Sequence, residues 1–234
     1  MTWQVPRIWE EGDVWIIGGG PSIPQQFNVP DKVIRKVVNG TFSPNIYSPY
    51  MFALHDKHVI GINVAYQIGD WIDMVFFGDG GFFLKYQHKL AEFPKLRVSC
   101  SPKTKDVSWV KYLSRDGSHS RGITSNPKAV SWNGNSGAAA ISIAANAGAR
   151  RIILLGFDMK VNDRADQHWH DLYGRGAVKD ERRARKMPFH KHVRGFPAIA
   201  DDAKRRNIEI LNASPDSAIE CFRKVTVEEL LWKK

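Results

Sequence analysis

The chain has 234 residues and a formal net charge of +10. Its hydrophobic content of 43% and aromatic content of 11% supply a packed core, which excludes an intrinsically disordered chain. This length is typical of one large domain, and we treat residues 1–234 as a single domain. No apolar run reaches membrane-spanning length, and the first residues lack the pattern of a signal peptide.

The cysteines and the distribution of charge further limit the kinds of protein that this chain could be. Cys100 and Cys221 lie far apart in the sequence, so we expect neither a disulfide framework nor a cysteine zinc site. This cysteine usage predicts a cytoplasmic location. Positive charge is concentrated between Arg175 and Arg194, where eight basic residues accompany two acidic ones. This run indicates a solvated basic face, a lid over a phosphorylated ligand, or a surface that meets nucleic acid.

The first element in chain order is an apolar run, Val14–Ile17, that leads directly into a glycine cluster. The cluster and its continuation are Gly18, Gly19, Gly20, Pro21 and Ser22. A buried parallel strand followed by such a turn can present backbone N–H groups to a phosphate, although a tight turn without a ligand is an equal alternative. A Walker loop would need lysine after the last glycine, and a dinucleotide fingerprint would need glycine at Ile23, so neither is expected.

Strands and helices then alternate along the chain. Further strands are predicted at His58–Asn63, Trp71–Phe77, Leu96–Cys100, Lys128–Trp132, Arg151–Leu155 and Ile208–Leu211. Helices are predicted at Asp31–Val38, Phe82–Phe93, Gly137–Ala147 (capped by Asn135-Ser136), Pro197–Arg206 and Ser217–Phe222. Residues 101–135 are an expected polar insertion, and 160–194 an expected basic lid-like segment. The alternation predicts an α/β domain, a mainly parallel sheet flanked by helices.

Ligands of such a sheet lie beyond the carboxyl ends of its strands. There we expect Gly18–Ser22, Asn63, Asp79, Asp158 and Asn212 to gather. The two aspartates are candidate ligand or metal contacts, with turn formation or helix capping as the alternative role. Two HxH pairs, His168/His170 and His190/His192, have metal-ligand spacing, but no carboxylate or cysteine extends either pair. A single histidine acting as general base is the more economical hypothesis.

Several short sequence blocks follow one another along the chain in the order found in a known family. They are Gly18–Ile23, Ile62-Asn63, Val75–Phe77 with Phe82-Phe83, Ser136-Gly137, Arg151–Asp158, His190 and Ser214–Ser217. With these blocks the chain resembles the bacterial lipooligosaccharide sialyltransferases, and also the MptE-like family that includes 6-hydroxymethylpterin pyrophosphokinase. The resemblance implies a Rossmann-like nucleotide-binding fold.

The same resemblance implies roles for individual residues. Gly18 to Ser22 and Asn63 would contact the nucleotide of a nucleotide-sugar donor, of the CMP or UDP type, and Ser136 and Gly137 would lie beside the donor. His190 would be the general base, and Lys160 and Asp158, at the end of the strand Arg151–Asp158, would be the other catalytic residues. Two positions depart from the sialyltransferase pattern: Gly19 replaces an asparagine, and Lys160 replaces the tyrosine that steadies the leaving phosphate. A lysine can stabilise the leaving phosphate electrostatically, but its presence does not support specificity for sialic acid.

The expected function is therefore a nucleotide-dependent transferase, with a glycosyltransferase favoured. The net charge makes a nucleic-acid or other polyanionic acceptor, such as a modified base in DNA, a further hypothesis. A second hypothesis is a Mg²⁺-dependent pyrophosphokinase, for which Asp79 would be the metal ligand. A third is a non-catalytic nucleic-acid-binding module on an inherited nucleotide fold.

Overall fold

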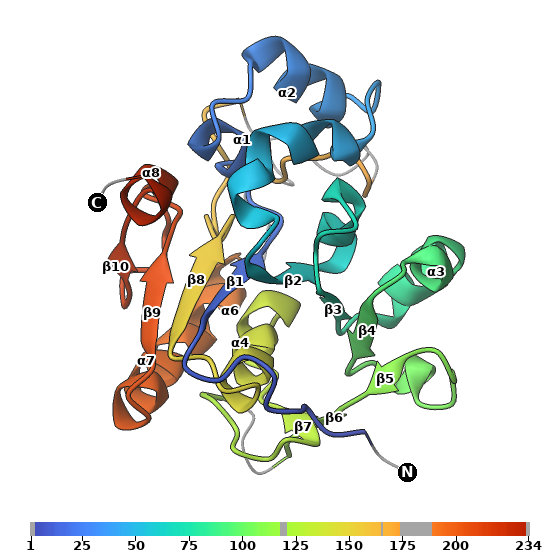
Figure 1. Ribbon diagram of the computed structural model, residues 1–234, viewed down its shortest axis with the longest axis vertical. Coiled ribbons are helices and arrows are strands. Elements are labelled where there is room, and N and C mark those ends of the chain that lie inside the picture. The colour runs from blue at the N-terminus through green and yellow to red at the C-terminus, as the bar shows by residue number, and fades with distance from the viewer. Residues whose placement is uncertain (1–2, 118–120, 165, 174–188, 233–234) are drawn as a thin grey trace.

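The computed structural model describes residues 3–117, 121–164, 166–173 and 189–232. The strands of its main sheet are β1 (Asp13–Ile17), β2 (His58–Ile62), β3 (Met74–Phe77), β4 (Leu96–Ser99), β5 (Lys111–Tyr112), β8 (Arg151–Leu155), β9 (Glu209–Asn212) and β10 (Arg223–Lys224). In the described residues they lie in the order β10-β9-β8-β1-β2-β3-β4-β5, and all neighbours are parallel (Figure 1). β6 (Ser114–Arg115) and β7 (Ala129–Val130) pair separately. The predicted α/β class with a parallel sheet is confirmed.

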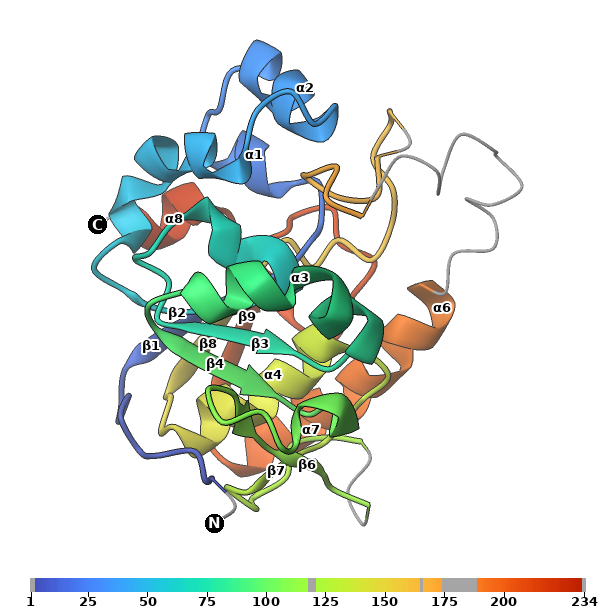
Figure 2. The same ribbon diagram turned by 90° about the vertical axis from the view of Figure 1, so that its right-hand side faces the viewer.

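The central strands are apolar throughout because both faces of the sheet are covered. Along β1, Trp15 and Ile17 enter one hydrophobic cluster, whereas Val14 and Ile16 enter another. One face carries α1 (Ile23–Gln26), α2 (Asp31–Val38), the 3₁₀ segments η1 (Pro44–Leu54) and η2 (Asn63–Ile68), α3 (Gly80–Glu92) and α8 (Val227–Leu231). The other face carries α4 (Ser136–Asn146) and α7 (Phe196–Arg205), as Figure 2 shows.

Element boundaries agree with the sequence pattern where the pattern is strongly periodic. The helix at Asp31–Val38 and the strand at Arg151–Leu155 have the predicted bounds. The predicted helix at Ser217–Phe222 is wrong. The Ser217 hydroxyl donates to the carbonyl of Phe157 at 2.6 Å, and the N–H of Ala218 donates to the carbonyl of Asp158 at 2.9 Å. These bonds to a distant segment replace the bonds that a helix would make.

Other differences are smaller. The third strand begins at Met74 rather than Trp71, and the strand predicted at Lys128–Trp132 is reduced to Ala129–Val130. The polar insertion has structure of its own, since β5 extends the main sheet and β6 pairs with β7. In the part of the chain that is described, no helix is long and apolar enough to cross a membrane.

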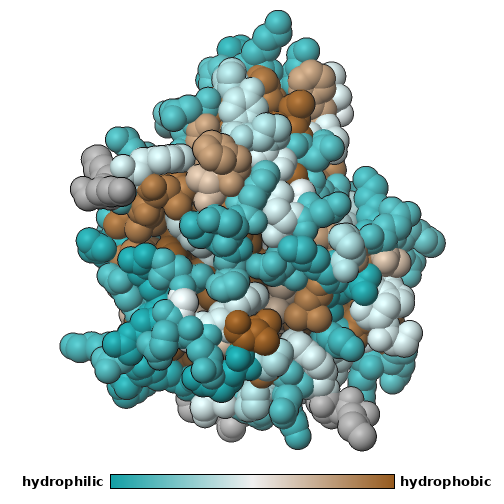
Figure 3. All heavy atoms as spheres, viewed as in Figure 1, coloured by the Kyte–Doolittle hydropathy of each residue, from teal (hydrophilic) through white to brown (hydrophobic). Residues whose placement is uncertain are grey.

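The order of the strands creates a switch point next to β1. The chain runs outward from β1 through β2 to β5 and then returns through β8 to the opposite side of β1. In open α/β sheets the crevice at such a point receives ligands. The face shown in Figure 3 is mostly hydrophilic. Of the exposed large apolar residues, Ile8 precedes β1, Phe52 lies in η1 and Leu84 lies in α3. A ligand site is therefore expected in this crevice.

Candidate nucleotide-binding cleft

A cleft opens at this switch point, beyond the carboxyl ends of β1, β2 and β8. It is lined by Gly18, Gly19, Gly20, Ile62, Asn63, Asn135, Ser136, Gly137, Gly156, Phe157, Met159, Lys160, Gln167, His168, Phe189 and His192. The structure thus brings together most of the residues predicted to contact a nucleotide. Pro21, Ser22, Asp79, Asp158 and His190 are not among the lining residues.

The glycine loop is clamped from behind by the segment around Trp169. The indole N–H of this buried residue donates to the carbonyl of Gly18 at 2.9 Å, and its backbone N–H donates to the carbonyl of Gly19 at 3.2 Å. His168 Nδ1 lies 3.1 Å from the same Gly19 oxygen. The carbonyls of Gly18 and Gly19 are therefore engaged on the protein side. The N–H groups of Gly18 and Gly20 also donate within the protein, to the carbonyls of Leu155 and Gly156, each at 2.8 Å. The loop thus forms a rigid wall without side chains, which a ligand can approach closely. No sequence pattern indicates this role of Trp169.

Asp158 supports the loop from below. The Ser22 hydroxyl donates to Asp158 Oδ2 at 3.0 Å, and burial raises the pKa of this carboxyl. A Cβ at Gly20 would lie 2.7 Å from Asp158 Cγ and 2.6 Å from the carbonyl oxygen of Gly156. Only glycine fits at this position, because the loop passes directly over the carboxylate. Asp158 and Ser22 hold the loop in shape, whereas Gly18, Gly19 and Gly20 form the wall of the cleft.

The opposite wall is the amino end of α4. Asn135 is the N-cap, and its Oδ1 accepts a hydrogen bond from the N–H of Ala138 at 2.8 Å, as predicted. The hydroxyl of Ser136 accepts from the N–H of Gly78 at 3.2 Å, which ties this wall to the end of β3. Helix amino ends carry partial positive charge and free N–H groups, so this wall favours an anionic ligand.

Two polar side chains complete the cleft. Lys160 lies in the loop after β8, is exposed and lines the cleft, so it places a cation there. Asn63 has a left-handed backbone with φ of 52°, and among the described residues its buried Oδ1 has no hydrogen-bond partner. A buried acceptor without a partner loses its hydration, so it favours a ligand that donates a hydrogen bond there.

The two histidines of α6 (Phe189–His192) point to different surroundings. His190 is exposed, whereas His192 is half-buried and lines the cleft. Desolvation, and secondarily the neighbouring His190, lower the pKa of the His192 imidazole. His192 is consequently neutral at pH 7 and able to accept a proton. The sequence contained the signal, an HxH spacing, but no means of choosing between its two members.

The other HxH pair forms a stack of rings. His168 and His170 lie parallel, with centroids 5.1 Å apart and an interplanar angle of 2°, and Tyr173 contacts both edge-on. His168 Nδ1 faces a carbonyl, so it carries the ring proton, and His170 Nδ1 accepts from the N–H of Leu172 at 3.1 Å. Within the described ranges, no group of three or more His, Cys, Asp or Glu residues lies close enough to hold a metal ion.

The other residues predicted to bind a ligand do not line the cleft or lie outside the described residues. Asp79 is exposed and caps α3, accepting from the N–H groups of Gly81 at 2.5 Å and Phe82 at 3.0 Å. Asn212 is fully buried at the end of β9. Most of the basic run that begins at Arg175 lies outside the described residues.

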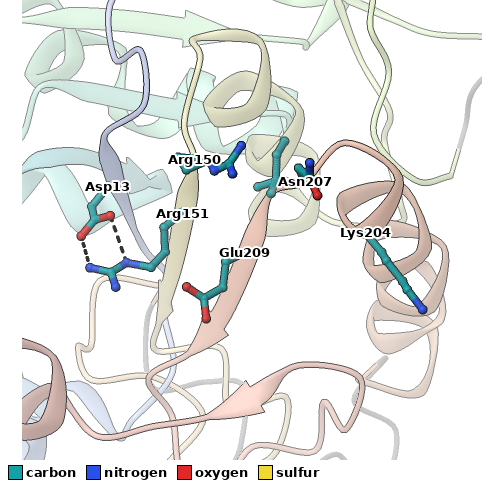
Figure 4. A pocket seen from close by; sticks show the side chains of 7 residues that line it. Asp13, Arg150, Arg151, Lys204, Asn207 and Glu209 are labelled. Atoms are coloured by element: carbon teal, nitrogen blue, oxygen red, sulfur yellow. Dashed lines mark hydrogen bonds and ion pairs between the residues drawn. The ribbon is translucent and has the colours of Figure 1, made fainter.

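A second hollow lies at the opposite, amino end of β1 and β8, and Figure 4 shows its charged side chains. Arg151 makes a two-pronged hydrogen-bonded ion pair with Asp13, and Arg150 lies 4.0 Å from Glu11. These arginines are paired within the protein, and this end of a parallel sheet is not the one where ligands bind. The cleft at the carboxyl ends is the candidate site.

No family model matches the chain, and no curated protein matches it. Among solved structures, the MAf glycosyltransferase from Magnetospirillum magneticum AMB-1 aligns with a TM-score of 0.52 and 15% identity, covering 96% of this chain and 35% of that chain. The sialyltransferase CstII from Campylobacter jejuni in complex with cytidine-5'-monophosphate aligns with a TM-score of 0.49 and 15% identity, covering 93% and 86%. A CST-II complex with trisaccharide acceptor and CMP aligns with a TM-score of 0.47 and 17% identity, covering 90% and 84%.

The likeness to the MAf enzyme concerns the fold. At that level the prediction is confirmed: the chain has a Rossmann-like α/β fold that it shares with the MAf glycosyltransferase. The chain spans about a third of the MAf enzyme's length.

Proposed function

We propose that this protein is a nucleotide-dependent glycosyltransferase that moves a sugar from a nucleotide-sugar donor to an acceptor hydroxyl. The observation that carries the proposal is the convergence of the glycine loop, the amino end of α4 and Lys160 on one cleft at the sheet's switch point. The helix end and the lysine suit a sugar-linked phosphate, and the glycines let the ligand approach the backbone closely. The fold that the chain shares with the MAf glycosyltransferase supports the same reaction class.

The donor would lie across the cleft. Gly18, Gly19 and Gly20 would contact the nucleotide, with Asn63 accepting a hydrogen bond from its ribose or base. Ser136 and Gly137 would face the phosphate through the amino end of α4. Lys160 would stabilise the charge that develops on the leaving phosphate, which is most valuable in a cleft shielded from water. CMP- and UDP-type donors are the two to test.

The reaction would be a direct displacement. A histidine of α6 takes the proton from the acceptor hydroxyl, and the hydroxyl oxygen forms a bond with the anomeric carbon. The bond from that carbon to the phosphate oxygen breaks, and its electron pair leaves with the nucleotide. His190 is the base that the sequence resemblance implies, and His192 is the histidine that faces the cleft.

The acceptor would carry negative charge. A net charge of +10 favours a polyanion, and a modified base in DNA is the specific acceptor that we propose to test. Phosphate contacts release counterions, so binding to DNA would weaken steeply as salt rises. A binding constant that does not change between low and high salt would contradict a polyanionic acceptor.

The proposal is tested by measuring nucleotide release from CMP- and UDP-sugars by mass spectrometry, with and without EDTA. We expect release from one donor class, and a loss of about a hundredfold in rate for Lys160→Met, the size seen when a single transition-state donor is removed. The matched control is Lys57→Met, because Lys57 lies before β2 at the far end of the sheet. Magnesium-dependent release of AMP from ATP would instead establish a pyrophosphokinase.

A further inference from the structure

The hydrogen bonds of Asn135 connect the two walls of the cleft. Its side-chain Oδ1 accepts from the N–H of Ala138 at 2.8 Å and so caps α4. Its Nδ2 donates to the backbone carbonyl of His192 at 3.0 Å. One amide thus joins the helix end that faces the donor phosphate to the residue that presents an imidazole to the same cleft.

In the described part of the chain, this bond from Asn135 is the side-chain hydrogen bond that connects α6 to the rest of the fold. α6 has no buried residue, and 3₁₀ segment η5 (Val193–Gly195) follows it at once. The anchors that follow α6 are Val193, which is partly buried against the hydrophobic cluster beside α4, and Gly195, where a Cβ would lie 2.6 Å from Asn133 Cβ. Because α6 itself has no buried residue, the hydrogen bond to the carbonyl of His192 helps to fix where the imidazole lies.

We infer that His192 is the general base of the proposed transfer and that Asn135 is its positioning residue. This inference rests on the proposed function, because it assigns the proton acceptor of that reaction. The choice of His192 over His190 follows from exposure: His190 faces solvent, and His192 faces the cleft. A displacement of about 1 Å in a reacting group can cost a hundredfold in rate, so the tether matters for kcat.

The deciding variant is Asn135→Ser. Serine is as good an N-cap as asparagine, so α4 and the melting temperature are retained, but its short side chain does not reach the His192 carbonyl. We expect kcat for transfer to fall about tenfold to a hundredfold while the KM for the donor changes less than about threefold. Asn146→Ser, the same change at the far end of α4, should leave kcat and KM unchanged.

A second measurement does not depend on catalysis. The imidazole of His192 is followed by NMR as a function of pH, with His192→Gln to assign its signal. The groups around it are His190 on its own helix, and Lys160 and His168 on the facing wall. In the wild type its pKa lies below the usual value because it is desolvated, and in Asn135→Ser it should rise as the segment moves toward water.

The outcomes separate the inference from the proposed function. If Asn135→Ser leaves both kcat and the His192 titration unchanged, or if His190→Ala abolishes transfer while His192→Ala does not, the inference is wrong. If no nucleotide sugar is turned over but Asn135→Ser still shifts the His192 titration, the tether stands and the glycosyltransferase proposal fails.

Discussion

Replacement of Gly20 by alanine tests whether the glycine loop is shaped by the carboxylate beneath it. The new methyl group would lie 2.6 Å from the Gly156 carbonyl oxygen and 2.7 Å from Asp158 Cγ, so the loop or the carboxylate must move. Overpacking costs about 1–3 kcal/mol, and displacing the Ser22–Asp158 hydrogen bond adds about 1 kcal/mol. For a chain of this size the sum lowers the melting temperature by roughly 5–15 °C.

The assay is thermal and urea unfolding of Gly20→Ala beside a control, Gly117→Ala, where a Cβ meets nothing within 4 Å. The control should melt with the wild type. In an Asp158→Ala background, where the obstructing side chain is gone, Gly20→Ala should cost at least about 1 kcal/mol less. Equal costs in the two backgrounds would refute the proposed contact, and a Gly20→Ala melting curve identical to wild type would refute the whole account of the loop.

Three further predictions follow from the neighbouring contacts. Trp169→Phe keeps an aromatic ring but leaves the Gly18 carbonyl without its indole donor, so unfolding in urea should show a loss of about 1–2 kcal/mol; an unchanged midpoint would argue against the clamp. Burial lowers the pKa of His168 to about 4, below its unfolded value of about 6.5, so the free energy of unfolding should decline as the pH falls through that window. His168→Gln should make this decline shallower, and equal slopes would contradict the assignment. Asp79→Ser preserves the cap of α3 and should leave both melting temperature and nucleotide release unchanged, whereas Asp79→Ala should lose about 1 kcal/mol; abolished activity in Asp79→Ser would restore a ligand role for this residue.

Sequence patterns predict the fold where a local signal is strong. The apolar runs before Gly18 and Gly156 mark the two central strands, and the small residues after Asn135 mark α4 with its cap. The helix predicted at Ser217–Phe222 was wrong for a physical reason. The segment after Ser214 is held by bonds to Phe157 and Asp158, residues far away in the chain, and no local pattern reports such bonds.

The candidate site was predictable in part, because the topology of a parallel sheet decides which residues meet at its edge. Parallel strands bring their carboxyl ends together, so Gly18, Asn63 and Lys160 meet as the topology requires. Their supports could not be foreseen, because Trp169 and Asn135 act through backbone carbonyls that only the fold brings near. Asp79 had the right strand-end position, but its carboxylate is engaged by the first N–H groups of its own helix.

The central claim is that the cleft binds the nucleotide of a sugar donor, and a thermal-shift panel tests it directly. CMP, CDP, UDP, GDP, AMP and ATP are each added with and without magnesium. A ligand in hundredfold excess over its dissociation constant adds about 2.7 kcal/mol of stability. The account predicts a higher melting temperature with CMP or a nucleoside diphosphate, and a smaller shift for Lys160→Met. A shift only with ATP or AMP plus magnesium, or no shift with any nucleotide, would contradict it.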